Sequence, residues 1–572
     1  MGGLFFSGRI PNQTHIDVFF AAALRTAGSP CRMRYCVRYK ILSFLNLRTS
    51  FYGRRGGRSI MTSRWFSLPV LMAVFLSICI PLVGAQEITV RNDVDFSFMD
   101  PALITNSNDY TIAVNIYSGL LKFNPKTMEP EPDLAKSWSV SPDGLTYTFQ
   151  LRNNVQWHKG YGKLTAKDVK YSFDRIMENR VKSRYRTDFS NVREVEAVND
   201  YTVKIHMKAP DMSFVRKVLV YRPGYIVNQK AIETLGTKYN SSPIGTGPFI
   251  FDRWDPGSKT VLVANKDYFL GPPKLQKATF LVINEESVAQ LALEKGELDL
   301  VVFQSLDPLE SLKKTREVAE KKIIIDVKPE LNVTFLSINS CRKPFDDVRV
   351  RQALHYAINK DDLNAAAYGN LAPKADNFLN SGFFAYKPNV KVFEYNLEKA
   401  KKLLAEAGYP NGFDTDLLYH PQEPWKHYAP IIQEQLRQAG IRVKLNLLDR
   451  ATVEQLRQKG DFRLMYGSVS RPPDPDIMFS TYLLSSNSPY PNYFCYKNKE
   501  VDGLIAQGNR ESNPEKRKKI YYRIQDIVAE DTPLVPISYR TVLSAWRSNV
   551  KGYTFNALAN YVLYGVSVEG KK

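Results

Sequence analysis

The residue types that most often carry catalysis or bind metals are sparse in this chain. Its 572 residues include six histidines and five cysteines. His420 and His427 lie seven positions apart, which matches no zinc-ligand spacing. The sequence contains no phosphate-binding Walker loop, no dinucleotide fingerprint after a strand and no nucleophile elbow. We therefore expect no catalytic residue, no metal site and no cofactor, and hence no enzyme.

A second group of chemically capable residues lies near position 471. Arg471 is followed by two prolines and then by Asp474 and Asp476. A guanidinium suits a carboxylate, phosphate or sulfate, because it can donate two parallel hydrogen bonds to it. Arg471 therefore either binds an anionic group of a ligand, or lies on a rim, or pairs inside the protein with one of the two aspartates.

Trp425 is the aromatic candidate. It lies in a proline-rich segment with Tyr419, His420 and His427, and we expect a loop there. The indole either stacks on a ligand or packs within its own domain.

The elements that must position these residues alternate between short strands and amphipathic helices, which indicates a mixed α/β fold. Ser141-Pro142-Asp143-Gly144 is a turn signal, and the alternating apolar residues of 145–152 predict a half-buried hairpin strand. Thr165 and Asp168 form a capping-box pattern in front of an apolar helix face. Asp347 and Asn396 are expected to cap two further helices, and a third helix running to Gly440 feeds a strand at 441–447.

The charge of the chain is unevenly distributed. The formal net charge is +20, but residues 1–85 hold 11 Lys and Arg and a single acid, Asp17. The remainder carries 67 basic against 57 acidic residues, a mild excess of +10. Because no dense basic run is interleaved with stacking aromatics there, nucleic-acid binding is disfavoured.

The N-terminal region predicts export. Residues 61–85 have the layout of a signal peptide: Arg64, then an apolar stretch, then Val83-Gly84-Ala85 as a small-residue cleavage site. A permanent membrane anchor is the alternative, and lipid attachment at Cys79 is disfavoured because Ile78 is large. Residues 1–60 lack a periodic apolar face, so we expect a non-native or disordered extension or a targeting segment.

Two cysteines, Cys341 and Cys495, follow the expected cleavage point. In an oxidising compartment they either pair or stay as buried thiols, and a single distant pair has no spacing pattern that decides between the two.

An ordered series of short motifs resembles one protein family, the large periplasmic solute-binding proteins for dipeptides, oligopeptides and nickel (family 5 extracellular solute-binding proteins). The resemblance covers most of the chain after residue 85, and its strength lies in the joint order of the motifs. They are Met99-Asp100-Pro101-Ala102, Pro132-Asp133-Leu134-Ala135, Asp143-Gly144-Leu145-Thr146, Gly245-Thr246-Gly247-Pro248-Phe249, Pro344-Phe345-Asp346-Asp347, Ala407-Gly408-Tyr409, Asp474-Pro475-Asp476 and Asn492-Tyr493.

The resemblance implies a two-lobed α/β periplasmic-binding-protein fold, type II-like with an extra subdomain and a ligand cleft between the lobes. Lobe I would comprise residues 87–330 and 535–572, and lobe II residues 331–534. The chain would cross between them near 323–338 and 534–539, where the sequence is β-rich. Closure of the lobes about these crossings would enclose the ligand.

The resemblance also indicates where the ligand site lies and where this chain differs from the family's usual residues. Peptide-binding relatives carry an Asp that pairs with the ligand's α-ammonium group where this chain has Arg471, and an aromatic residue where it has Ser468. Since two cations would repel in a low-dielectric cleft, we expect a ligand with an anionic group, or one whose amine is blocked or absent. Further ligand contacts are expected at Ser468, Asp474, Asn106, Asn108 and Tyr110.

The implied function is capture of a peptide or peptide-like small solute in the periplasm and its delivery to an inner-membrane ABC permease with its ATPase, by a protein that works as a monomer. The alternative is an exported receptor or chaperone-like binding module not coupled to import. Ligand-dependent thermal stabilisation would favour the first.

Overall fold

The computed structural model describes residues 51–55, 58–62, 86–421, 424–558 and 560–570. The contacts divide the chain into two units, residues 1–83 and 84–572. In the first unit, the described residues form an antiparallel pair of strands, β1 (Phe51–Arg55) and β2 (Arg58–Thr62). The predicted signal peptide, apart from Met61 and Thr62, and the rest of the N-terminal extension lie outside the described residues.

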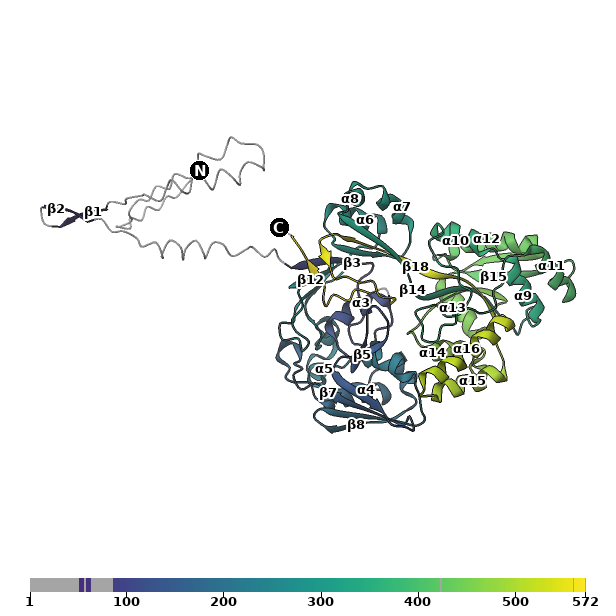
Figure 1. The fold of residues 1–572 in the computed structure, drawn as a ribbon, viewed down its shortest axis with the longest axis horizontal. Helices are drawn as coiled ribbons and strands as arrows, with labels where there is room; N and C mark the ends of the chain where they lie inside the picture. Colours follow the sequence, from purple (N-terminus) through teal and green to yellow (C-terminus); the bar gives the residue numbers. More distant parts are fainter. Residues whose placement is uncertain (1–50, 56–57, 63–85, 422–423, 559, 571–572) are drawn as a thin grey trace, which may run out of the picture. The chain divides into compact units, whose positions relative to one another are not determined.

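The second unit is built on a sheet of ten strands and a smaller sheet of four (Figure 1). The large sheet has the order β10 (Phe249–Asp255), β11 (Lys259–Ala264), β12 (Lys277–Val282), β3 (Glu87–Asn92), β13 (Leu300–Phe303), β18 (Leu534–Arg547), β14 (Ile323–Ile338), β17 (Leu464–Ser470), β15 (Phe413–Tyr419) and β16 (Ile441–Leu447). The small sheet has the order β6 (Ala135–Val140), β7 (Thr146–Leu151), β9 (Thr202–Met207) and β8 (Val192–Asn199). Two short pairs are β4 (Leu121–Phe123) with β5 (Pro130–Pro132) and β19 (Val550–Lys551) with β20 (Ser567–Val568).

Helices surround both sheets. Before β14 they are α3 (Ser107–Ile116), α4 (Ala166–Met177), α5 (Gln229–Leu235), α6 (Glu286–Lys295), α7 (Asp307–Lys313) and α8 (Arg316–Ala319). After β14 they are α9 (Val348–Ala357), α10 (Lys360–Tyr368), α11 (Leu397–Glu406), α12 (Trp425–Gln438), α13 (Arg450–Lys459), α14 (Pro475–Tyr482), α15 (Lys499–Arg510) and α16 (Pro514–Asp531). This mixed α/β architecture with one large sheet is the fold class predicted from the sequence.

Two long antiparallel strands, β14 and β18, connect the halves of the large sheet. Their pairing runs from Ile323 opposite Arg547 to Ser337 opposite Leu534, and the register shifts between Pro329 and Val333. One end of the β18 ladder pairs with β13, while the far half of β14 pairs with β17. These strands lie where the sequence predicts the two crossings, and we keep the names lobe I and lobe II for the halves on either side.

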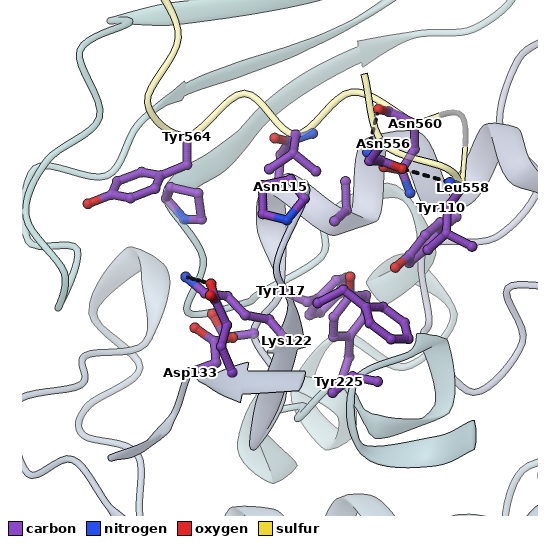
Figure 2. A pocket seen from close by; sticks show the side chains of 18 of the residues that line it. Tyr110, Asn115, Tyr117, Lys122, Asp133, Tyr225, Asn556, Leu558, Asn560 and Tyr564 are labelled. Atoms are coloured by element: carbon purple, nitrogen blue, oxygen red, sulfur yellow. Dashed lines mark hydrogen bonds and ion pairs between the residues drawn. The ribbon is translucent and has the colours of Figure 1, made fainter. Parts of the chain in front are cut away.

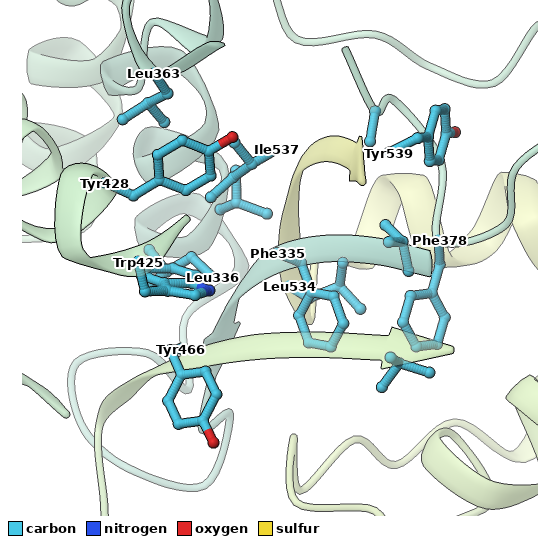
Figure 3. Packing of buried hydrophobic residues seen from close by; sticks show 14 of the residues in the cluster. Phe335, Leu336, Leu363, Phe378, Trp425, Tyr428, Tyr466, Leu534, Ile537 and Tyr539 are labelled. Carbon is cyan, nitrogen blue, oxygen red and sulfur yellow. The ribbon is translucent and has the colours of Figure 1, made fainter. Parts of the chain in front are cut away.

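The lobe II ends of β14 and β18 are embedded in an aromatic core (Figure 3). Phe335, Leu336 and Ile537 are fully buried. The Phe335 ring packs edge-on against Phe378 at 5.4 Å between centroids. Because the connecting strands are part of this core, a movement of lobe II must carry their far ends with it.

Several local predictions are confirmed. Strand β7 pairs with β6 in a hairpin, and its Tyr147, Phe149 and Leu151 are buried. At the start of α4, Oδ2 of Asp168 accepts a hydrogen bond from the backbone N–H of Thr165 at 2.8 Å. Asn396 caps α11 by accepting from the N–H of Lys399 at 2.9 Å.

The glycines of the Gly245-Thr246-Gly247 turn hold α3 in place. The N–H of Gly247 donates to the carbonyl of Ile116, the last residue of α3, at 2.8 Å. A Cβ atom at Gly245 would lie 2.0 Å from that carbonyl oxygen, so no larger residue fits there without displacing the helix.

Cys341 and Cys495 form a disulfide with a Cα–Cα distance of 5.7 Å. The bond joins the segment just after β14 to the segment just before α15. Of the two possibilities that the sequence leaves open, the structure contains the paired one.

Within the part of the chain that the structure describes, no helix is long and apolar enough to span a membrane. The described residues also contain no cluster of three or more His, Cys, Asp or Glu side chains that could hold a metal ion.

Candidate functional site

Arg471 lies in the segment that joins β17 to α14, and its side chain is half-buried. Nη2 donates a hydrogen bond to the hydroxyl of Tyr482 at 2.8 Å, and the guanidinium lies 5.6 Å from the centre of that ring. The phenol of Tyr482 raises the pKa of Arg471, so the side chain stays charged. Among the described residues, no carboxylate lies within ion-pair distance of it.

The Arg471 guanidinium lies within electrostatic range of lobe I. It interacts electrostatically with Tyr221 and with Asp188, both from the other lobe. Burial raises the pKa of Asp188, and the positive charges of Lys217 and Arg471 oppose that shift. Residues almost 300 positions apart in the sequence therefore share one electrostatic environment between the lobes.

The lobe I side of this region is formed by an arginine between two tyrosines. The Arg222 guanidinium lies 4.8 Å from the ring centre of Tyr110 and 4.9 Å from that of Tyr221. Its Nη1 donates to the backbone carbonyl of Thr105 at 2.8 Å. We call Asp188, Tyr221, Arg222, Arg471 and Tyr482 the interlobe cluster. A set of guanidinium groups against phenol rings suits a small anionic or aromatic solute.

Asp474 is not the partner of Arg471. Its carboxylate is fully buried and accepts two hydrogen bonds from Arg517, at 2.8 and 2.9 Å. The sequence-based possibility that Arg471 is neutralised by Asp474 is therefore wrong, because Arg517 from α16 already occupies both carboxylate oxygens. Asp474 also caps α14 by accepting from the N–H of Asp476.

The two lobes touch beside Asp474. The N–H of Met212 in lobe I donates to the carbonyl of Asn509 in lobe II at 3.0 Å. The Arg216 Nε atom lies 4.0 Å from Oδ2 of Asp474. Burial, followed by the negative charges of Asp474 and Asp211, raises the pKa of Asp476 to about 6.

Three of the predicted contact residues have local partners. Ser468 is exposed, and its hydroxyl donates to Oδ1 of Asn332 at 3.0 Å. Asn106 caps α3 by accepting from the N–H of Asp109 at 2.8 Å. Asn108 Nδ2 donates to Oδ1 of Asp93. These bonds fix the ends of the elements around the site, and direct contact with a ligand remains a prediction for all three residues.

Trp425 belongs to the core of lobe II. The expected loop is wrong at this position, because Trp425 is the first residue of α12 and only 1% exposed. Its ring packs against Tyr428 and Tyr466, at 5.8 and 6.2 Å between centroids (Figure 3). The structure thus brings Arg471 and Tyr110 towards the same region and leaves Trp425 enclosed.

Asp188, Tyr221, Arg222 and Tyr482 were not found by sequence reasoning. Each follows no motif of its own, and each gains its place from packing with a distant segment. The adjacent aromatic and basic residues Tyr221 and Arg222 were the one local signal that could have drawn attention to this stretch.

Comparisons with known proteins agree with one another. The model of a family described as bacterial extracellular solute-binding proteins, family 5, middle region, matches residues 129–490. The chain is 30% identical over 515 residues to heme-binding protein A of Haemophilus influenzae, covering 84% of this chain and 92% of that protein. It is also 30% identical over 483 residues to the glutathione-binding protein GsiB of Escherichia coli K12, with 82% and 92% covered.

Among solved structures, the periplasmic binding protein DppA of Helicobacter pylori, in complex with the peptide STSA, is similar with a TM-score of 0.72. The two chains are 31% identical, and the match covers 85% of this chain and 99% of DppA.

Proposed function

Because the chain belongs to the family 5 bacterial extracellular solute-binding proteins, we propose that it captures a small peptide or peptide-like solute bearing an anionic group and delivers it to an ABC importer. The observation that supports an anionic ligand is the half-buried Arg471, which lies within electrostatic range of lobe I and has no carboxylate within ion-pair distance among the described residues.

The solute is captured by a movement of the two lobes about the connecting strands β14 and β18. Lobe I, residues 87–330 and 535–572, and lobe II, residues 331–534, move about the register shift between Pro329 and Val333. Closure brings Arg471 towards Tyr221 and encloses the solute, and the closed form is the one that the permease recognises.

Export and partners complete the proposal. The segment 61–85 acts as a cleaved signal peptide and sends the protein to the periplasm, where it works as a monomer with an inner-membrane permease and its ATPase. The similar protein DppA of Helicobacter pylori is a periplasmic binding protein, which supports this location.

The positive charge of Arg471 favours a ligand with an anionic group. A free α-ammonium group beside Arg471 would place two cations in a partly desolvated site, whereas a carboxylate there would form a charge-assisted bidentate pair. Peptides and glutathione, the ligands named for two of the similar proteins, both carry carboxylates.

The test compares three forms of one dipeptide by calorimetry: N-acetylated, free, and carboxyl-amidated. The wild type should bind the acetylated, anionic form, and Arg471→Gln should weaken that binding by more than about tenfold. Arg463→Gln is the matched control, because Arg463 is exposed and directly precedes β17 in the same lobe.

Equal affinity for the three forms, or a preference that survives Arg471→Asp, would remove the anionic ligand. If no solute class stabilised the wild type against heat, capture itself would be excluded and a protein-binding module favoured. Product analysis after incubation would detect turnover.

A further inference from the structure

A cavity of about 320 Å³ lies within lobe I. Its walls come from α3, the β4–β5 hairpin and the C-terminal segment (Figure 2). Most of its lining is aromatic or aliphatic, and it includes five tyrosines: Tyr110, Tyr117, Tyr225, Tyr268 and Tyr564. A concave, largely apolar space of this size with a few polar groups is typical of a small-molecule site.

Asp133 is the buried polar group of this cavity. The residue is 3% exposed and lies near Lys122 and Tyr225 at one end of the lining (Figure 2). Oδ2 accepts a hydrogen bond from the N–H of Gly119 at 3.2 Å, whereas Oδ1 has no hydrogen-bond partner among the described residues. A buried acceptor without a donor is unfavourable, and a hydrogen-bond donor on a ligand would remove that penalty.

The neighbouring cations leave the carboxylate unpaired. The Lys122 amine lies 3.6 Å from the carboxylate of Glu131. The Arg152 Nε atom donates to the backbone carbonyl of Asp133 at 2.7 Å. Within the described ranges, neither cation forms an ion pair with the Asp133 carboxylate. Its negative charge therefore remains available to a ligand cation, which would compete with the Ser118 hydroxyl for the carboxylate.

We propose that this cavity binds an organic ammonium ion with a small apolar body, whose N–H donates to Oδ1 of Asp133. The apolar body packs among the tyrosines that line the cavity, and their π-electrons favour a nearby positive charge. This is a second site, beyond the capture of a solute at Arg471, and the two share only the wall that Tyr110 provides.

The probe pair is 2-phenylethylamine and its neutral isostere 2-phenylethanol, measured by calorimetry on the full chain at pH 7.5. The wild type should bind the amine at least about tenfold more tightly than the alcohol, and Asp133→Asn should abolish that preference. Glu194→Gln, which changes an exposed carboxylate on β8 of the same lobe outside the cavity lining, should alter amine affinity by less than about threefold. Arg471→Gln should leave it unchanged.

Two further measurements keep the proposal testable if Asp133→Asn misfolds. Val114→Phe places a ring in the cavity and should abolish binding of both probes. Burial raises the pKa of Asp133 to about 6, so lowering the pH from 7.5 to 5 should weaken binding of the amine, which stays protonated, but not of the alcohol.

Equal binding of amine and alcohol, amine binding that persists in Asp133→Asn, or loss of amine binding in Arg471→Gln would each overturn the second site. Failure of the dipeptide experiment leaves this result unaffected, because the two tests use different residues and different ligands.

Discussion

Two arginines of lobe II show how the same residue type serves stability in one place and recognition in another. Arg517 is buried, and although burial alone would lower its pKa, the carboxylate of Asp474 outweighs that effect and raises it. Removing either partner would leave an uncompensated buried charge. Arg471 has a phenol instead of a carboxylate as its hydrogen-bond partner, which leaves its charge to a ligand.

The raised pKa of Asp476 should make the folding stability depend on pH. Its folded pKa of about 6 exceeds the ordinary value of 3.8, so the folded state binds this proton more tightly than the unfolded chain. Its contribution to stability is therefore fully present below pH 3.8 and is lost as the pH rises through 6.

Asp476→Asn should accordingly stabilise the protein at pH 7, by on the order of 1–3 kcal/mol, and give little or no gain at pH 4. Denaturant titrations at both pH values check this, with Asp252→Asn, an exposed carboxylate on β10, as the control. A gain of equal size at both pH values would contradict the assignment.

At the scale of elements, short-range chemistry decided most of what the sequence predicted correctly. Turn residues, caps and apolar periodicity identified β7, α4 and α11 because each depends on neighbours within a few positions. Trp425 was misplaced because a proline-rich stretch favours a loop locally, while packing against Tyr428 and Tyr466 draws it into a helix and the core.

The candidate site shows the limit of sequence-based prediction. Arg471 was identified from its position in a motif, but Asp188 and Tyr221 come from another lobe, and no local sequence pattern indicates that they lie near it. The free oxygen of Asp133 was likewise invisible, because its lack of a partner depends on how Lys122 and Arg152 are engaged.

The N-terminal cap of α11 should contribute measurably to stability. Asn396→Ala removes the side chain that accepts from the N–H of Lys399, and should cost about 1 kcal/mol of unfolding free energy. Lys402→Ala, on the exposed face of the same helix, should change stability by less than about 0.5 kcal/mol. Equal effects in the two variants, measured by denaturant unfolding, would show that the cap contributes nothing.

At the scale of the whole unit, residues 84–572 combine a ten-stranded sheet with two hydrophobic cores. One core lies within lobe I, and the other extends from lobe II along the crossing strands to α6, β13 and α7 of lobe I. Met212 and Arg216 contact lobe II through a backbone hydrogen bond to Asn509, the carboxylate of Asp474 and the ring face of Phe384, whereas β14 and β18 are buried on the lobe II side. Opening should therefore separate the polar contacts and leave the strands paired.

The disulfide predicts redox-dependent stability. It closes a loop of 154 residues within lobe II, so reduction should lower the unfolding free energy by about 2–5 kcal/mol. The measurement is a denaturant titration of residues 86–572 with and without dithiothreitol. In the Cys341→Ser/Cys495→Ser double variant the reductant should have no effect, and a shift there would assign the sensitivity to something else.

The pairing of Ser337 with Leu534 also has an architectural consequence. The chain enters and leaves this half of the molecule through two neighbouring backbone positions, and the half carries its own covalent crosslink. It therefore resembles a cassette inserted into a host domain, and an exchange of the cassette between homologues, joined at these two positions, would transplant Arg471 without disturbing the cavity around Asp133.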